Sequence, residues 1–172
     1  MISTQLVPVN RTRSKPRGLG FAVAGMLLGL LYATVSVYWG LGGTALLDTV
    51  GASLGRGGGG LVVVLALWAA VVLKAIAAVL PLTVIYHRGG ATWQRLAKVS
   101  VWIEAAVLVA YGLVLSTAGL MVQLGIIHAS ASADRRALAW HAYLWDPWFL
   151  LWGLLVVAAL LRARHGAGRP RN

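Results

Sequence analysis

The sequence has no cysteine among its 172 residues. Structural disulfides, thiol catalysis and thiolate metal sites are therefore excluded, and so are the quinone-linked thiol oxidoreductases of similar small size. It also lacks a P-loop, a dinucleotide-binding fingerprint, a nucleophile elbow, a zincin motif and a c-type haem site. The segment Gly55-Arg-Gly-Gly-Gly-Gly60, which includes the run Gly57–Gly60, resembles a phosphate loop only in its glycine content and lacks the Lys-Ser/Thr, so it predicts a linker. We therefore expect no cofactor.

Acidic residues are scarce, with 4 Asp and Glu against 15 Lys and Arg, which gives a net charge of +11. Such an excess could indicate nucleic-acid binding, but no basic face with interleaved stacking aromatics is found in a soluble module. Hydrophobic residues make up 59% of the chain and occur in long runs, which is typical of a polytopic membrane protein. The expected partners are membrane lipids, anionic on the cytoplasmic side, and a membrane protein or a second copy of the chain, with no nucleic acid.

Four apolar runs predict an all-α bundle of four transmembrane helices. The expected spans are residues 19–41, 61–85, 99–127 and 146–162. The last is barely long enough, because 17 residues at about 1.5 Å each cover roughly 25 Å. We expect it to begin at Asp146, as the N-cap residue, with Pro147 in the first helical position.

The distribution of basic residues predicts the orientation of the bundle. With four spans, one side of the membrane receives Arg11, Arg13, Lys15, Arg17, Arg88, Arg95, Lys98, Arg162, Arg164, Arg169 and Arg171. The other side receives only Arg56, Arg135 and Arg136. The positive-inside rule then predicts that both termini lie in the cytoplasm. Residues 1–18 are expected to form a disordered basic tail, and residues 163–172 a second basic tail.

Two ionisable residues fall inside the predicted spans. Lys74 and Glu104 lie at depths about 6 Å apart, a gap that a lysine side chain can close. One hypothesis is a structural ion pair that locks the second and third helices. The other is a catalytic, proton-relay or substrate-anchoring site, with Tyr111 as a further donor. Protonation of Glu104, or a Lys74 side chain that reaches the interface alone, is also consistent with the sequence.

A second candidate group lies at the expected outer surface. Its polar members are Asp48, His128, His141 and Asp146, and the nearby aromatic residues are Trp39, Trp140, Trp145 and Trp148. Two histidines and two carboxylates suffice chemically for acid-base catalysis, but their spacing matches no metal-ligand pattern, so no metal is expected. If the helix continues through Asp146-Pro147, His141, Trp145, Trp148 and Trp152 share one face and predict an aromatic-lined ligand pocket. The simpler interpretation is an interfacial belt of tryptophans.

Small residues at helical spacing predict close helix contacts. Gly25 and Gly29 form such a step in the first span, and Gly112, Ser116 and Gly119 form one in the third. Residues without bulky side chains let a neighbouring helix approach closely in a membrane.

Three segments carry a resemblance to a known family. They are Tyr38-Trp-Gly-Leu-Gly-Gly43, Leu47-Asp-Thr-Val-Gly51 and His141-Ala-Tyr-Leu-Trp-Asp-Pro-Trp-Phe-Leu-Leu-Trp-Gly153. The chain resembles the small four-helix integral membrane proteins of unknown function that are common in actinobacteria. The resemblance implies architecture and a bacterial inner membrane, but no activity.

Two functional hypotheses remain open. The first is an accessory protein or a bundle that binds a hydrophobic or lipid-like molecule. The second is a small membrane enzyme or transporter that uses Glu104 and Lys74, or the outer group of Asp48, His141 and Asp146. The sequence leaves open whether the protein is an enzyme.

Overall fold

The computed structural model of the protein describes residues 15–50, 61–130 and 132–167, and all the regular structure in these residues is helical. Its elements are α1 (Leu19–Gly40), η1 (Leu47–Thr49), α3 (Leu61–Ile85), α4 (Ala91–Gln123), α5 (Arg135–Trp140), η2 (His141–Trp145) and α6 (Asp146–Ala167). Four segments are long and apolar enough to cross a membrane: Leu19–Gly40, Val64–Ile85, Ala91–Gln123 and Arg135–Arg164. The predicted fold class, an all-α bundle of four transmembrane helices, is confirmed.

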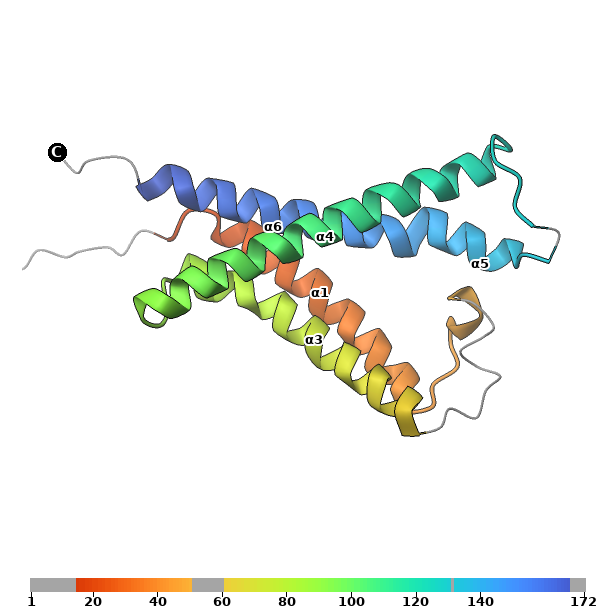
Figure 1. The fold of residues 1–172 in the computed structure, drawn as a ribbon, viewed down its shortest axis with the longest axis horizontal. Helices are drawn as coiled ribbons and strands as arrows, with labels where there is room; N and C mark the ends of the chain where they lie inside the picture. Colours follow the sequence, from red (N-terminus) through yellow and green to blue (C-terminus); the bar gives the residue numbers. More distant parts are fainter. Residues whose placement is uncertain (1–14, 51–60, 131, 168–172) are drawn as a thin grey trace, which may run out of the picture.

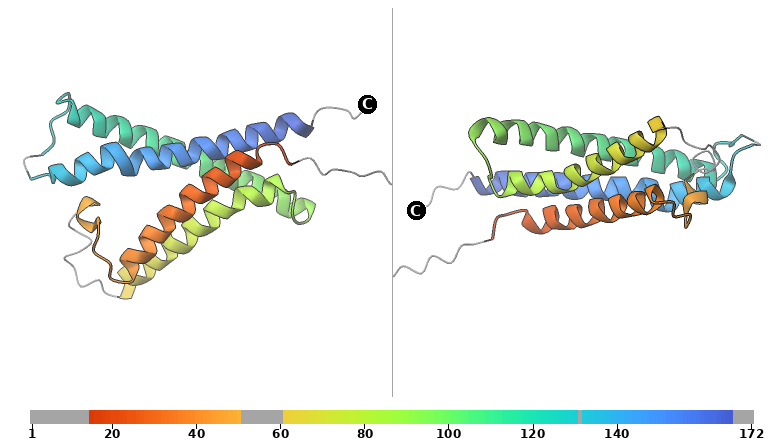
Figure 2. Two further views of the ribbon diagram at one scale, coloured as in Figure 1. Left: turned by 180° about the vertical axis from the view of Figure 1, so that it is seen from behind. Right: turned by 90° about the horizontal axis from the view of Figure 1, so that it is seen from below.

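The four long helices form two antiparallel pairs, α1 with α3 and α4 with α6 (Figure 1). The pairs cross toward the end of the molecule where α1 begins and α6 ends, and they diverge toward the end that carries η1 and α5 (Figure 2). We call the latter the splayed end. The opposite end carries Arg88, Arg95, Lys98 and Arg162, and we call it the basic end.

The helices pack closely because small residues lie at their contacts, both within the pairs and between them. A methyl group on Gly29 of α1 would lie 2.8 Å from the Ala78 side chain of α3, and the fully buried Trp152 of α6 covers the same glycine. Gly112 of α4 faces the backbone of Leu150. The predicted close approach at both small-residue steps is therefore confirmed.

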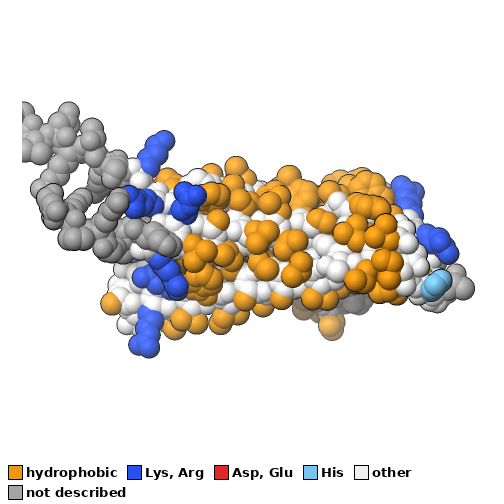
Figure 3. Space-filling model, turned by 90° about the horizontal axis from the view of Figure 1, so that it is seen from above, with side chains coloured by type: hydrophobic (Ala, Val, Ile, Leu, Met, Phe, Trp, Pro, Cys, Tyr) orange, Lys and Arg blue, Asp and Glu red, His pale blue; other side chains and the backbone are white. Residues whose placement is uncertain are grey.

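The surface of the helices is apolar between two polar ends. Leu27, Leu65, Leu73 and Ile103 are each more than half exposed, as expected for side chains that face lipid. On the face shown in Figure 3, basic side chains gather at the basic end, and fewer lie at the splayed end. The arrangement fits an apolar bilayer core flanked by two interfaces.

Two predicted helix boundaries differ from the structure. The third helix, α4, begins earlier, at Ala91, and it ends at Gln123 rather than at residue 127. Gly125 follows with φ of 72°, a left-handed conformation that commonly closes a helix. The predicted linker Gly57–Gly60 and most of the predicted N- and C-terminal tails lie outside the described residues.

The fourth span starts before the predicted Asp146, although α6 itself begins at that residue. Asp134, not Asp146, caps the helix: its carboxylate accepts the backbone N–H groups of Arg136 and Ala137. The helix then runs through α5, η2 and α6, and Asp146 has the right-handed helical conformation (φ −77°, ψ −42°). The last span is consequently longer than the 17 residues that the sequence suggested.

Candidate functional site

A π-helical turn over His141–Trp145 interrupts the last span. Here the backbone N–H of Asp146 donates to the carbonyl of His141, five residues earlier, instead of four. Pro147 follows at once; its ring clashes with the carbonyl four residues earlier in a regular helix and has no N–H to donate. The wider turn accommodates the proline without ending the helix.

The same turn brings two functional side chains together. In a regular α-helix, residues five positions apart point about 140° apart, because each residue turns the chain by about 100°. Across the wider turn, Nδ1 of His141 lies 3.2 Å from Oδ1 of Asp146. Asp146 is buried, with 4% of its surface exposed, whereas the His141 side chain is 35% exposed. A buried carboxylate thus orients a histidine that solvent or a ligand can reach.

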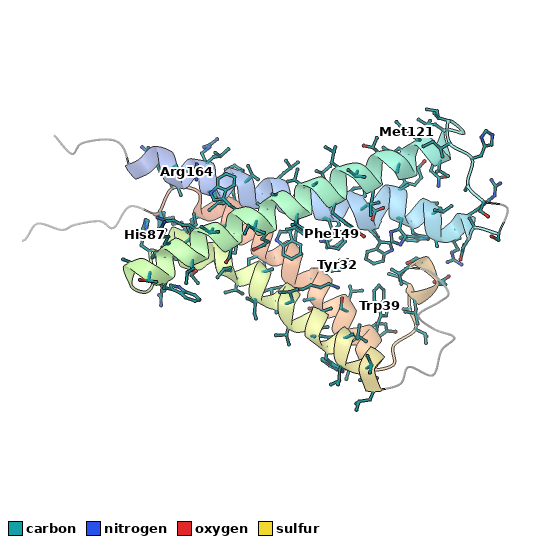
Figure 4. All side chains as sticks on the ribbon, in the orientation of Figure 1. Tyr32, Trp39, His87, Met121, Phe149 and Arg164 are labelled. Carbon is teal, nitrogen blue, oxygen red and sulfur yellow. The ribbon has the colours of Figure 1, made fainter. Side chains whose placement is uncertain are left out.

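Six aromatic side chains contact one another beside this pair at the splayed end. We call them the aromatic cluster: Tyr32, Trp39, Tyr111, Trp145, Trp148 and Phe149. Tyr32 of α1 lies at its centre, with its ring centroid 4.8 Å from Phe149 and 5.8 Å from Trp145. Figure 4 shows Tyr32, Phe149 and Trp39 between the diverging helix pairs. The cluster therefore joins the two pairs across the region where their backbones separate.

Asp146 adjoins this cluster along the last span, because Trp145 precedes it directly and Phe149 follows three residues later. Tyr111 of α4 packs its ring edge-on against Phe149, with 5.3 Å between the ring centroids. Tyr111, predicted as a donor beside Glu104, thus belongs to the aromatic cluster.

The connection after α1 covers the cluster at the splayed end. The indole N–H of Trp145 donates to the hydroxyl of the fully buried Thr49 in η1, at 3.1 Å. The indole N–H of Trp39 donates to the carbonyl of Ala45 at 2.8 Å, and the Tyr38 hydroxyl accepts the Ala45 N–H. These bonds hold the connection against α1 and the last span.

Asp48 lies beside this group but does not join it. Its carboxylate forms an exposed ion pair with Arg136, 3.0 Å away, and among the described residues no ion pair joins it to His141 or Asp146. His128 lines a separate hollow of the outer connection, together with Gln123 and Arg135. No cluster of three metal-ligating side chains occurs in the described part of the chain.

Lys74 and Glu104 do not form the hypothesised ion pair among the described residues. Nζ of Lys74 donates to the Ser36 hydroxyl at 2.9 Å and lies 4.4 Å from the ring centroid of Tyr32, both on α1. Lys74 therefore faces α1 rather than α4. The two carboxylate oxygens of Glu104 are buried, and neither has a hydrogen-bond partner in the described residues. Lys74 is consequently not paired with Glu104 in the structure, and it contacts the aromatic cluster through the ring of Tyr32.

The sequence matches the model of one protein family. The model of a family described as "Protein of unknown function (DUF3995)" matches residues 28–156. The chain belongs to this family. The matched range includes the aromatic cluster, Lys74, Glu104 and the His141–Asp146 pair. No curated protein and no solved structure matches the chain. The expectation of a family without a known function is thus confirmed, whereas an actinobacterial origin stays a prediction.

The sequence places Tyr32 and Ser36 on one polar-aromatic face of the first span, either a packing face or a ligand wall, but it did not single out Thr49. Nothing local indicates that Lys74 lies over Tyr32 or that Thr49 is buried under Trp145. The spacing Tyr32–Ser36, one helical turn, was the available signal: it places a phenol and a hydroxyl on one face, where a membrane-embedded lysine needs partners.

Proposed function

We propose that the protein is a membrane-embedded binding protein for a hydrophobic or lipid-like small molecule. The ligand enters at the splayed end, between the α1–α3 and α4–α6 pairs, and contacts the aromatic cluster. The observation that carries the proposal is the divergence of the two pairs at the end where the aromatic cluster lies beside a buried carboxylate. Apolar walls with a few convergent polar groups are typical of small-molecule sites.

The polar groups define the class of ligand. Aromatic faces bind an apolar body, and the His141–Asp146 pair supplies one acceptor and one group that both donates and accepts. The ligand is therefore a molecule with a hydrophobic body and a single polar or cationic head group. The aromatic rings contact one another in the structure, so ligand binding requires these side chains to rearrange.

The proposed orientation places this site on the outer side of the bacterial cell membrane. Both termini then lie in the cytoplasm, and the basic end meets anionic lipids of the inner leaflet. Support comes from the position of Arg88, Arg95, Lys98 and Arg162 at the end opposite η1. A phosphatase fused to the C-terminus should be inactive and a fluorescent protein at the same position should be bright; the reverse pattern would contradict this orientation.

Native mass spectrometry from mild detergent tests the binding function. The wild-type protein should retain one small molecule per chain. Asp146→Asn keeps the shape of the side chain but removes its charge, and should lower the retained fraction about tenfold, as expected for a hydrogen bond to a charged group. Asp48→Asn is the matched control, because Asp48 is the exposed carboxylate at the same end. Equal retention by the two variants would refute the proposed site.

A second function, that of a small membrane enzyme, is favoured by the geometry of His141 and Asp146. A histidine oriented by a buried carboxylate is a common general acid-base arrangement. His141→Gln separates the two functions: an enzyme should retain product in the wild type and substrate in the variant, so that the bound masses differ. A binding protein should retain the same mass in both.

A further inference from the structure

The basic end carries a hollow that the proposed ligand site does not use. It lies between α4 and the end of α6, and its charged members are Arg95 and Lys98 of α4 and Arg164 of α6. Trp102 forms its wall, and Cζ of Arg164 lies 4.7 Å from the Trp102 ring centroid. Two helices thus direct three cations and one aromatic ring into a single surface site of about 430 Å³.

The charge of this hollow is not neutralised by a neighbouring carboxylate. The ion pairs found among the described residues are Asp48 with Arg136 and Asp146 with His141, and both lie at the splayed end. Glu104 is the acidic residue nearest in sequence to Arg95, but it lies nine residues further along α4, about 180° around the helix. An anion is therefore the complementary occupant.

An apolar strip continues from the charged groups toward the middle of the bundle. Val99, Ile103 and Ala106 line the same hollow, and Val99 and Ile103 are more than half exposed. From Val99 to Ala106 the helix rises about 10 Å, which is enough to contact the upper part of an acyl chain. Trp102 stands beside the strip at the depth where tryptophan typically marks the membrane interface.

We infer that this hollow binds one phospholipid with an anionic head group. The phosphate contacts Arg95, Lys98 and Arg164, and one acyl chain lies along Val99 and Ile103. The stacking of Arg164 on Trp102 fixes the guanidinium at the interface and leaves its N–H groups for the phosphate oxygens. Basic hollows between transmembrane helices and anionic lipid head groups are complementary in charge and in depth. The inference is independent of the ligand at the splayed end.

The test compares two variants with the same loss of charge. Arg95→Gln/Arg164→Gln removes two cations of the hollow, and Arg88→Gln/Arg135→Gln removes two cations outside it. Each full-length protein is reconstituted in nanodiscs of equimolar phosphatidylglycerol and phosphatidylethanolamine, extracted in mild detergent and analysed by native mass spectrometry. Since each interfacial cation contributes about fivefold to the affinity for anionic lipid, the first variant should retain one phosphatidylglycerol fewer than wild type.

Three results would overturn the inference. They are equal retention by the two variants, equal retention of phosphatidylethanolamine by the wild type, and complete displacement of the lipid by inorganic phosphate at the same molar ratio. The last would show a phosphate site without an acyl-chain contact. A change in retention of the small molecule at the splayed end would concern only the proposed function, because it is a different bound mass.

A second measurement uses a more conservative variant. Phosphatidylglycerol with brominated acyl chains should quench tryptophan fluorescence more in the wild type than in Trp102→Phe, because Trp102 lies against the bound chain. Brominated phosphatidylethanolamine should quench the two proteins with a smaller difference. The same difference for both lipids would contradict a head-group-specific site.

Discussion

Trp145 in the last span donates its indole N–H to the hydroxyl of Thr49, 96 residues earlier in the chain, at 3.1 Å. This bond joins the connection after α1 to the π-helical turn that also positions His141 beside Asp146. The splayed end is therefore held by contacts between distant segments rather than by continuous helix packing. Ligand entry has to change this contact or pass beside it.

The contribution of this bond can be measured with a double-mutant cycle. Trp145→Phe and Thr49→Val should each lower the free energy of unfolding by about 1 kcal/mol, the usual net value of a hydrogen bond. The double variant should lose little more than either single variant, because both remove the same interaction. Thermal unfolding in a mild detergent gives the four values. Fully additive losses would show that the bond does not stabilise the protein.

Lys74 should be coupled to Ser36 and not to Glu104. Because Nζ of Lys74 donates to Ser36, the cycle of Lys74→Met with Ser36→Ala should give a coupling energy of about 0.6–1.7 kcal/mol, as for interhelical hydrogen bonds in membranes. The cycle of Lys74→Met with Glu104→Gln should give a coupling near zero. Unfolding in mixed micelles measures both. Strong coupling between Lys74 and Glu104 would restore the ion-pair hypothesis.

Gly29 of α1 and Gly112 of α4 lie at close helix contacts and should not tolerate a larger side chain. A methyl group on Gly112 would lie 2.7 Å from Cα of Leu150, and one on Gly29 would lie 2.8 Å from the Ala78 side chain. Gly112→Ala and Gly29→Ala should each cost about 1–3 kcal/mol through overpacking.

Gly20 is the matched control for these variants, because no atom lies within 4 Å of a methyl group placed there. Gly20→Ala should be neutral or raise the free energy of unfolding by up to about 1 kcal/mol, the difference in helix propensity. Thermal unfolding of the three variants decides the matter: a Gly20→Ala protein as unstable as Gly29→Ala would mean that helix packing is not the cause.

The two carboxylates at the splayed end should differ in their effect on stability. Asp146→Ala should cost about 2 kcal/mol, because it leaves His141 without its buried partner and creates a void. Asp48→Ala should cost less than about 1 kcal/mol, since the Asp48–Arg136 pair is exposed. Scanning calorimetry in detergent compares them. Equal losses would contradict the structural role assigned to Asp146.

The fold followed from the sequence because membrane helices are recognised by long apolar runs, and these need no tertiary information. The N-cap of the last span was predicted at Asp146 because an Asp-Pro dipeptide commonly begins a helix. In the structure Asp134 caps the helix, and a π-turn accommodates Pro147 without ending it. The pairing of His141 with Asp146 depends on this π-turn, because a regular helix would point the two side chains in different directions.

The hydrogen-bond partner of Lys74 could not be predicted from the sequence. Depth along the helices made Lys74 and Glu104 compatible, and the rotation of α3 about its axis decided against their contact. Depth is readable from residue numbers, whereas helix rotation depends on which small residues pack against one another. Gly29 of α1 meets Ala78 of α3. The sequence indicated that Gly29 allows close packing, but not which helix approaches it.

Site-specific photo-cross-linking tests the central claim most directly. A benzophenone amino acid in place of Trp39, at the edge of the aromatic cluster, should capture a small hydrophobic molecule in cells, detected as one added mass on the purified protein. The same residue in place of Trp93, an exposed tryptophan at the basic end, should not capture that molecule. The absence of an adduct at position 39, or the same adduct at both positions, would contradict a ligand site between the helix pairs at the splayed end.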